Sequence, residues 1–413
     1  MRFGLGVPTG TEGMMYPVPY ADPDDAVRLA LAAEKLGFDS VWGNDHVSTQ
    51  AYVRAEFPSP PRFYDPYLYL AYVAAQTSTL GLATAVTVMS FRHPVVVAKQ
   101  AATLDQLSHG RFILGLGIGA YREEAEAMWP DRPIHRGRHA DEFFRAIGLL
   151  LGQRRASFDG EFIAFRDVES SPKPAQPSLP VLSGGNAPGS RERAAKYATG
   201  WLPAVLSPAE IGSGLADIRR IAERAGRELP AGFDVAPQLS VALGRNREDA
   251  LARFERTQLH AHMRSLSGST LRDQQGGWTD RNLIGSAPDI LERVQAYAEA
   301  GATTLSGLLF ACNTVEETLD AMADFAENVI APYRKHERKV TPSARLPGPQ
   351  TPARRAQAPP GICPATGLPG SATAWPPPRS TLWCSSRPPT CSTPAATAAS
   401  APRYTAPRRS RRS

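Results

Sequence analysis

The chain has 413 residues, and 42% of them are apolar, so it can bury the core of one large domain or of two ordinary ones. Its net charge of +6 depends on residues 341–413, which carry ten arginines and no lysine, aspartate or glutamate, whereas residues 1–340 have a net charge of −4. A mildly acidic body of this kind excludes a basic groove for nucleic acid.

Eight short apolar runs alternate with amphipathic helical patterns along the first 335 residues. Continuous Val, Ile and Leu runs are typical of strands that are buried on both faces of a parallel sheet. The predicted strands span residues 3–7, 40–42, 82–88, 112–116, 181–183, 200–202, 238–243 and 304–310.

Helix start signals separate these runs. Asp22 provides an N-cap, Pro23 occupies the first helical position, and apolar residues at helical spacing follow until Gly37. Similar signals predict helices that begin near Asp65, Pro94, Arg138, Ser207, Ser286 and Thr314, the last of them running to about Ile330.

The alternation of strand and helix determines the predicted fold. Eight strand–helix units indicate parallel pairing, and eight units in about 330 residues fit a closed (β/α)8 TIM barrel with insertions. An open doubly wound sheet is the competing arrangement. Residues 50–64 and 245–281 are predicted insertions, and the barrel domain is predicted to span residues 1–335.

Residues 341–413 have a different character. Sixteen of these 73 residues are proline, and the segment is rich in Ser, Thr, Ala and Arg without a periodic apolar pattern. Such a segment cannot bury enough surface to offset the entropy of ordering it. We expect a disordered tail without function, or a stretch that is not native coding sequence.

Cysteine usage and hydropathy indicate the compartment. Only Cys312 lies outside the last 73 residues, which argues against a disulfide framework, and the other three cysteines lack the paired spacing of a zinc site. The N-terminal residues do not resemble a signal peptide, and no apolar run approaches the length of a membrane span. The sequence therefore predicts a cytoplasmic protein with no membrane partner.

His46 is the leading acid–base candidate. The active groups of a (β/α)8 barrel sit at the C-terminal ends of its strands, and His46 follows the second predicted strand. The adjacent Asp45 could orient the imidazole ring and tune its pKa. The alternative is a structural histidine that caps the next segment.

A glycine turn follows the fifth predicted strand. Gly184 and Gly185 precede Asn186 and a helical segment, and free backbone N–H groups at such a turn form an anion site. Arg191 and Arg193 could add positive charge. The alternative is a tight turn that needs glycine only for its backbone dihedrals.

Two other patterns predict no site. Gly115, Gly117 and Gly119 do not form a dinucleotide fingerprint, because the spacing would require glycine at position 120, which is Ala120. The histidine pairs have no acidic or thiolate partners at ligand spacing, so we expect no metal. These pairs are His135 with His139 and His260 with His262.

The strand ends, taken in this order, resemble the luciferase-like superfamily of flavin-dependent oxidoreductases. The resemblance covers about residues 1–335 and implies a barrel that holds FMN or the deazaflavin F420 at its C-terminal face. Members include monooxygenases that use reduced FMN and oxygen, and dehydrogenases or reductases that use F420. The matching segments are residues 37–46, 92–111, 115–119, 184–186, 200–203 and 297–301.

The resemblance also implies roles for individual residues. His46 falls where F420-using members place their active-site histidine, and the Ala85–Val86 bond falls where many members hold a non-proline cis peptide that supports the flavin ring. Gly184 and Gly185 fall in the flavin phosphate turn. The same matching segments assign Gly117, Gly119 and Asn186 to the cofactor site.

One position departs from the family pattern. Ala120 stands where F420-dependent sugar-phosphate dehydrogenases carry a glutamate proton donor, which puts that chemistry in doubt. Glu123 or Glu124 could reach the same place from nearby.

The sequence as a whole predicts a flavin-type oxidoreductase that acts on a small organic substrate. F420 is favoured over FMN, because the Asp45-His46 pair resembles the F420 branch and the composition resembles a GC-rich, actinobacterial-type gene. The alternatives are a monooxygenase supplied with reduced FMN by a separate reductase, a non-catalytic flavin-binding protein, and a nicotinamide-dependent dehydrogenase on an open sheet. A homodimer is compatible with each of these.

Overall fold

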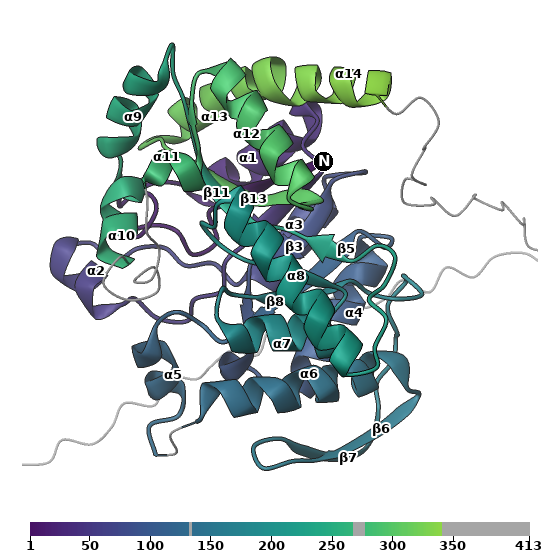
Figure 1. Cartoon of the computed structure of the whole chain (residues 1–413). Helices are drawn as coiled ribbons and strands as arrows, with labels where there is room; N and C mark the ends of the chain where they lie inside the picture. The colour runs from purple at the N-terminus through teal and green to yellow at the C-terminus, as the bar shows by residue number, and fades with distance from the viewer. Residues whose placement is uncertain (132–133, 267–276, 341–413) are drawn as a thin grey trace, which may run out of the picture. The chain divides into compact units, whose positions relative to one another are not determined.

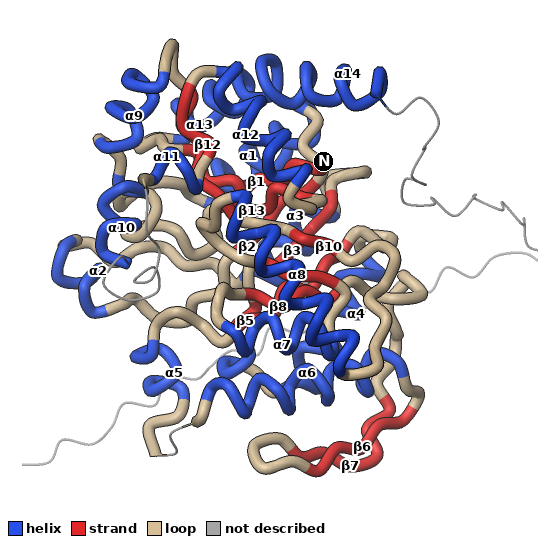
Figure 2. Tube along the Cα trace, in the orientation of Figure 1, coloured by secondary structure: helices blue, strands red, loops and turns tan. Residues whose placement is uncertain are grey.

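The parallel strands of the domain form a closed ring. The computed structural model describes residues 1–131, 134–266 and 277–340, so the predicted tail lies outside the described residues. The path of hydrogen-bonded strands runs from β10 through β1 and β13 to β11 (Figure 2). The ring closes because β11 follows β10 after two residues and the Gln238 N–H donates to the Pro203 carbonyl, just after β9, at 2.8 Å. This closure confirms the predicted (β/α)8 barrel and excludes the open doubly wound sheet. The ring consists of β1 (Arg2–Val7), β2 (Ser40–Gly43), β3 (Gly81–Thr84), β5 (Phe112–Gly117), β8 (Val181–Gly184), β9 (Gly200–Leu202), β10 (Asp234–Val235) with β11 (Gln238–Leu243), and β13 (Thr304–Phe310).

Two strands differ from the prediction. The predicted strand 82–88 divides into β3 and β4 (Thr87–Val88), because the chain leaves the ladder at the cis peptide bond between Ala85 and Val86. The predicted strand 238–243 is preceded by β10, and only Ala236 and Pro237 separate the two segments. A further short strand, β12 (Leu283–Gly285), pairs with the end of β11.

Helices cover the outside of the ring (Figure 1). The carboxylate of Asp22 accepts a hydrogen bond from the Asp25 N–H, and Gly37 ends the helix with a φ of 83°, as the sequence predicts. Capping boxes begin at Ser207 and Ser286. The covering helices are α1 (Pro23–Leu36), α3 (Pro66–Ala74), α4 (Pro94–Leu107), α6 (Arg136–Gly152), α7 (Pro188–Tyr197), α8 (Pro208–Arg224), α12 (Ala287–Glu299) and α13 (Val315–Phe325).

Other elements were not predicted or extend further than predicted. An antiparallel hairpin of β6 (Arg155–Asp159) and β7 (Ala164–Glu169) precedes β8, and a 3-10 turn spans Met89–Phe91. The last helix does not end at Ile330 but continues through a π-helical segment (Ala326–Ile330) into α14 (Ala331–Val340). The insertions and the loop after β5 contain α2 (Ala51–Glu56), α5 (Arg122–Met128), α9 (Arg247–Glu255), α10 (Gln258–Leu266) and α11 (Trp278–Arg281).

A compact apolar cluster fills the inside of the barrel. Trp42 is completely buried there, and it requires glycine at position 4, where a Cβ would lie 2.1 Å from the indole nitrogen. Ala85 and Val86 pack against this cluster and are half-buried, so they form its layer at the C-terminal mouth. The other cluster members are Ala83, Leu182, Leu202 and Ala236, with Ile113 packed beside them.

None of the helices in the described ranges combines the length and the apolar character that crossing a membrane would require.

Candidate active site

His46 lies just beyond the C-terminal end of β2, at the mouth of the barrel. Its Nδ1 atom is 2.9 Å from the Oε2 atom of Glu124, and its side chain is 12% exposed. The imidazole ring packs between Phe63 and Tyr121, with ring centroids 5.5 and 5.8 Å away. Its Nε2 atom has no hydrogen-bond partner within the described residues, so one nitrogen is held and the other is left for a ligand.

Glu124 is the residue that orients this ring. It lies in the first turn of α5, its side chain is 2% exposed, and it also accepts hydrogen bonds from the backbone N–H groups of Val47 and Ser48. Burial alone would raise the pKa of Glu124, but the hydrogen bond and charge of His46, with further hydrogen bonds from Gln50 and Val47, hold it below its usual value. An ionised carboxylate at this distance favours the tautomer that carries the proton on Nδ1, and in that tautomer the lone pair of the neutral ring is on Nε2.

Asp45 does not orient His46, so this prediction is wrong. Its Oδ2 atom instead accepts hydrogen bonds from the Val88 N–H at 3.0 Å and from Arg92 at 2.5 Å. Arg92 reaches further to Asp65, at 2.7 Å. Burial raises the pKa of Asp45 and outweighs the opposing effect of Arg92. Asp45 therefore joins the end of β2 to β4, whereas His46 contacts α5.

The peptide bond between Ala85 and Val86 is cis, as the resemblance implies. The side chain of Val86 occupies the space beside two of the predicted cofactor-site glycines. A Cβ at Gly117 or Gly184 would lie 2.4 or 2.5 Å from a Val86 methyl group. At Gly119 the φ is 76°, and a Cβ would lie 3.0 Å from the Val88 side chain. These glycines therefore allow the Ala85–Val86 segment to sit at the mouth, and a direct cofactor contact from them stays a prediction.

The glycine turn after β8 is arranged differently from the expectation. Gly185 has a φ of 114°, and its N–H donates to the Leu202 carbonyl at 3.0 Å, so this donor is already used. The side-chain amide of Asn186 exchanges two hydrogen bonds, of 2.8 and 2.9 Å, with the backbone of Ala204. Within the described part of the chain, the backbone N–H groups of Asn186 and Ala187 have no acceptor.

The two arginines of α7 are both paired. Arg191 contacts Asp217 at 2.9 Å and donates to the Asn186 carbonyl at 2.6 Å, and Arg193 contacts Asp141 at 3.0 Å. No side chain caps the N-terminus of α7, and a cavity of about 790 Å³ opens beside it. An anion at this turn would therefore be bound by backbone N–H groups and the helix dipole rather than by these guanidinium groups.

A chain of hydrogen bonds joins the two insertions to the loop after β5. The Tyr52 hydroxyl lies 3.1 Å from the Tyr121 hydroxyl and 3.2 Å from Nδ1 of His262, which connects α2 to the residue before α5 and to α10. His262 is 4% exposed, and burial, with the charge of His46, lowers its pKa to about 4. The sequence did not single out this network, because its members are far apart in the chain.

The remaining histidines of the predicted pairs have structural roles. His135 accepts a hydrogen bond from the Arg138 N–H at the start of α6, and His139 is buried beside Phe143. His260 packs between Phe254 and Trp278. Within the described ranges, no three potential metal ligands lie close enough to hold an ion.

Comparison with known proteins adds sequence relatives and structural neighbours. An uncharacterised protein of Mycobacterium tuberculosis is 32% identical over 255 residues, which cover 57% of this chain and 85% of the relative. An F420-dependent glucose-6-phosphate dehydrogenase of Kineococcus radiotolerans is 32% identical over 182 residues, which cover 44% of this chain and 52% of that enzyme.

Two solved structures share the fold. A monooxygenase from Streptomyces bottropensis superposes with a TM-score of 0.65 at 23% identity, over 81% of this chain and 100% of that one. An F420-dependent secondary alcohol dehydrogenase, in complex with an F420–acetone adduct, gives a TM-score of 0.63 at 18% identity, over 80% and 98% of the two chains. At these identities the likeness shows the fold alone.

The sequence model of one family, described as luciferase-like monooxygenase, matches residues 1–304. This match includes the end of β2 with His46, the Ala85–Val86 segment and the turn after β8. The protein therefore belongs to the luciferase-like monooxygenase family.

Proposed function

We propose that the protein is a flavin-type oxidoreductase that uses coenzyme F420, in preference to FMN, on a small organic substrate with a hydroxyl or carbonyl group. The observation that carries this proposal is the state of His46. Its Nδ1 is held by the buried carboxylate of Glu124, and its Nε2 at the barrel mouth has no partner among the residues that the structure describes.

The mouth suits a planar ring with a negatively charged chain. Ala85 and Val86 offer a half-buried apolar surface for a ring. The uncapped N-terminus of α7 and the free N–H groups of Asn186 and Ala187 suit a phosphate, and the cavity of about 790 Å³ beside them leaves room for it. When bound, F420 or FMN supplies hydride transfer, and reduced FMN also supplies reaction with oxygen.

The protein's own part is to move a proton. In the proposed tautomer the neutral ring of His46 carries its lone pair on Nε2. This atom can accept the proton of a substrate hydroxyl while the carbon that bears the hydroxyl loses a hydride to the cofactor. In the reverse direction the protonated ring returns that proton to a carbonyl oxygen. The ionised Glu124 stabilises the imidazolium that forms in between, as a carboxylate does in other histidine-based sites.

The preference for F420 rests on two observations. The Kineococcus relative is an F420-dependent dehydrogenase, and the Asp45-His46 pair resembles the F420 branch. The alternative is a monooxygenase that receives reduced FMN from a separate reductase, since the Streptomyces neighbour is a monooxygenase. A cytoplasmic location and a homodimer are compatible with both.

Titration with each cofactor tests the proposal. Purified protein should quench the fluorescence of F420 at micromolar concentration or below and bind FMN more weakly. A screen of small secondary alcohols should then bleach the F420 absorbance. Tighter binding of FMN, with oxygen consumption when the FMN is reduced, would favour the monooxygenase. If neither cofactor binds, the proposal is wrong.

A further inference from the structure

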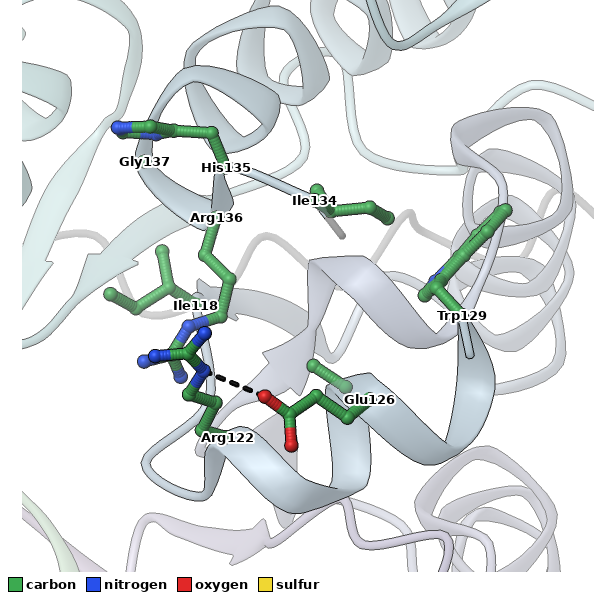
Figure 3. A pocket seen from close by; sticks show the side chains of 9 residues that line it. Ile118, Arg122, Glu126, Trp129, Ile134, His135, Arg136 and Gly137 are labelled. Carbon is green, nitrogen blue, oxygen red and sulfur yellow. Dashed lines mark hydrogen bonds and ion pairs between the residues drawn. The ribbon is translucent and has the colours of Figure 1, made fainter. Parts of the chain in front are cut away.

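A second cavity lies beside the mouth, between α5 and the start of α6 (Figure 3). It has a volume of about 350 Å³. Ile118 and Trp129 supply apolar walls, and Arg122 and Arg136 supply positive charge. Nothing in the proton transfer by His46 uses this cavity.

Arg136 is the unusual member of the cavity lining. It is half-buried and donates a hydrogen bond of 2.8 Å to the Gly119 carbonyl, but it forms no ion pair within the described residues. Burial and the nearby charge of Arg122 lower the pKa of Arg136. Figure 3 shows the two guanidinium groups close together at one end of the cavity, with Arg122 paired to Glu126 at 2.7 Å. The Arg136 guanidinium group therefore keeps N–H donors that have no acceptor among the described residues.

The cavity and the turn after β8 lie at the starts of neighbouring helices. Gly119 lies two residues beyond Gly117, which packs against Val86, so the Arg136 hydrogen bond connects the cavity to the Ala85–Val86 segment. Arg193 of α7 pairs with Asp141 of α6, which makes the two helices neighbours. Since each helix follows its strand in a (β/α)8 barrel, both begin at the C-terminal face.

We propose that this cavity binds the carboxylates of the oligoglutamate tail of F420, with Arg136 as the cation that receives them. The inference rests on the proposed function and deepens it. FMN ends at its phosphate, whereas F420 continues beyond the phosphate into a chain of glutamates, and such a chain can extend from the turn after β8 toward this cavity on the neighbouring helix. A guanidinium group matches a carboxylate with two parallel hydrogen bonds. Arg136 therefore selects the longer, more acidic cofactor.

The test compares binding of F420 carrying its glutamates, F420 from which the glutamates have been removed, and FMN. Wild-type protein should bind the glutamylated form about tenfold more tightly than the shortened form, and this advantage should shrink as salt screens the charges. Arg136→Gln should abolish the advantage while leaving the affinity for the shortened form unchanged. Arg136→Lys should restore part of it.

Arg138→Gln is the matched control, because Arg138 lies on the same helix but pairs with Glu161 at the surface, at 2.8 Å. This variant should bind all three cofactors as the wild type does. Equal loss of both F420 forms in Arg136→Gln would mean that Arg136 only orders the loop at Gly119, and would overturn the inference. Equal binding of the two F420 forms by the wild type would overturn it as well. Binding of FMN alone refutes the tail site but not the oxidoreductase, whereas binding of no flavin refutes both.

Discussion

The loops after β2 and after β8 lie at the same end of the barrel but use their polar groups in different ways. After β2, one side chain keeps a free atom, since His46 is held through Nδ1 and its Nε2 has no partner in the described part of the protein. After β8, the nearby polar side chains are all bound: Asn186 to Ala204, Arg191 to Asp217 and Arg193 to Asp141. We therefore expect the first loop to take part in the chemistry and the second to bind through its backbone.

Replacement of His46 tests whether the loop after β2 takes part in the chemistry, and it should have the largest effect. His46→Ala should lower turnover by about a hundredfold to ten-thousandfold, because a general acid–base group is lost. Cofactor affinity should change little, since the turn after β8 is intact. Steady-state rates on a substrate from the alcohol screen, with a fluorescence titration of F420, measure both. His260→Ala is the control, and equal turnover in His46→Ala and wild type would remove His46 from the mechanism.

Replacement of Glu124 should have the next largest effect. Glu124→Gln keeps the shape but loses the charge that selects the Nδ1–H tautomer, so turnover should fall by roughly a hundredfold. The loss should appear in kcat, while the affinity for the cofactor stays close to that of the wild type. A general structural defect would weaken both. Glu123→Gln should behave as wild type, because Glu123 contacts the Ala51 N–H and not His46.

The same substitution should change stability in acid. The pKa of Glu124 is below its usual value in the fold, so its ionised form stabilises the protein at pH values above the ordinary carboxyl range near 4.5. This stabilisation is lost as the pH falls through and below that range. Thermal melts from neutral pH to about pH 3 should therefore fall more steeply for wild type than for Glu124→Gln. Parallel curves would contradict the ionised state.

Replacement of Gly185 tests whether the turn after β8 binds the cofactor. Its φ of 114° is a conformation that side chains with a Cβ disfavour, although the nearest atoms, in Ser190, lie 3.6 Å away. Gly185→Ala should therefore distort the turn and weaken cofactor binding by about tenfold. Gly148→Ala is the control, since nothing lies within 4 Å of a Cβ there. Unchanged affinity in Gly185→Ala would make the turn purely structural.

Removal of residues 341–413 should have no effect on either loop. Their composition predicts no contribution to folding, so a chain ending at Val340 should keep its melting temperature and cofactor affinity. A drop of several degrees would show that the tail packs on the barrel.

Local patterns predicted the elements of the fold better than the contacts of the site. Proline and acidic caps predicted the starts of most barrel helices, as at Asp22 and Ser207, because a cap involves residues a few positions apart. Glu124 is 78 residues from His46, so no spacing rule could pair them. Adjacency in sequence favours Asp45 as the partner of His46, yet the Asp45 carboxylate binds Val88 and Arg92 instead. The β6–β7 hairpin was missed because most of its residues are exposed and carry little apolar signal.

The buried His262 simplifies the interpretation of any kinetic titration. Its pKa of about 4 means that it stays uncharged from mildly acidic to alkaline solution, so the Tyr52–Tyr121–His262 hydrogen bonds hold the same protonation state throughout. A change of rate between about pH 5 and 8, where histidines ordinarily titrate, therefore cannot arise from His262. The Tyr52–Tyr121–His262 contacts can therefore be treated as constant when rates measured at different pH values in this range are compared.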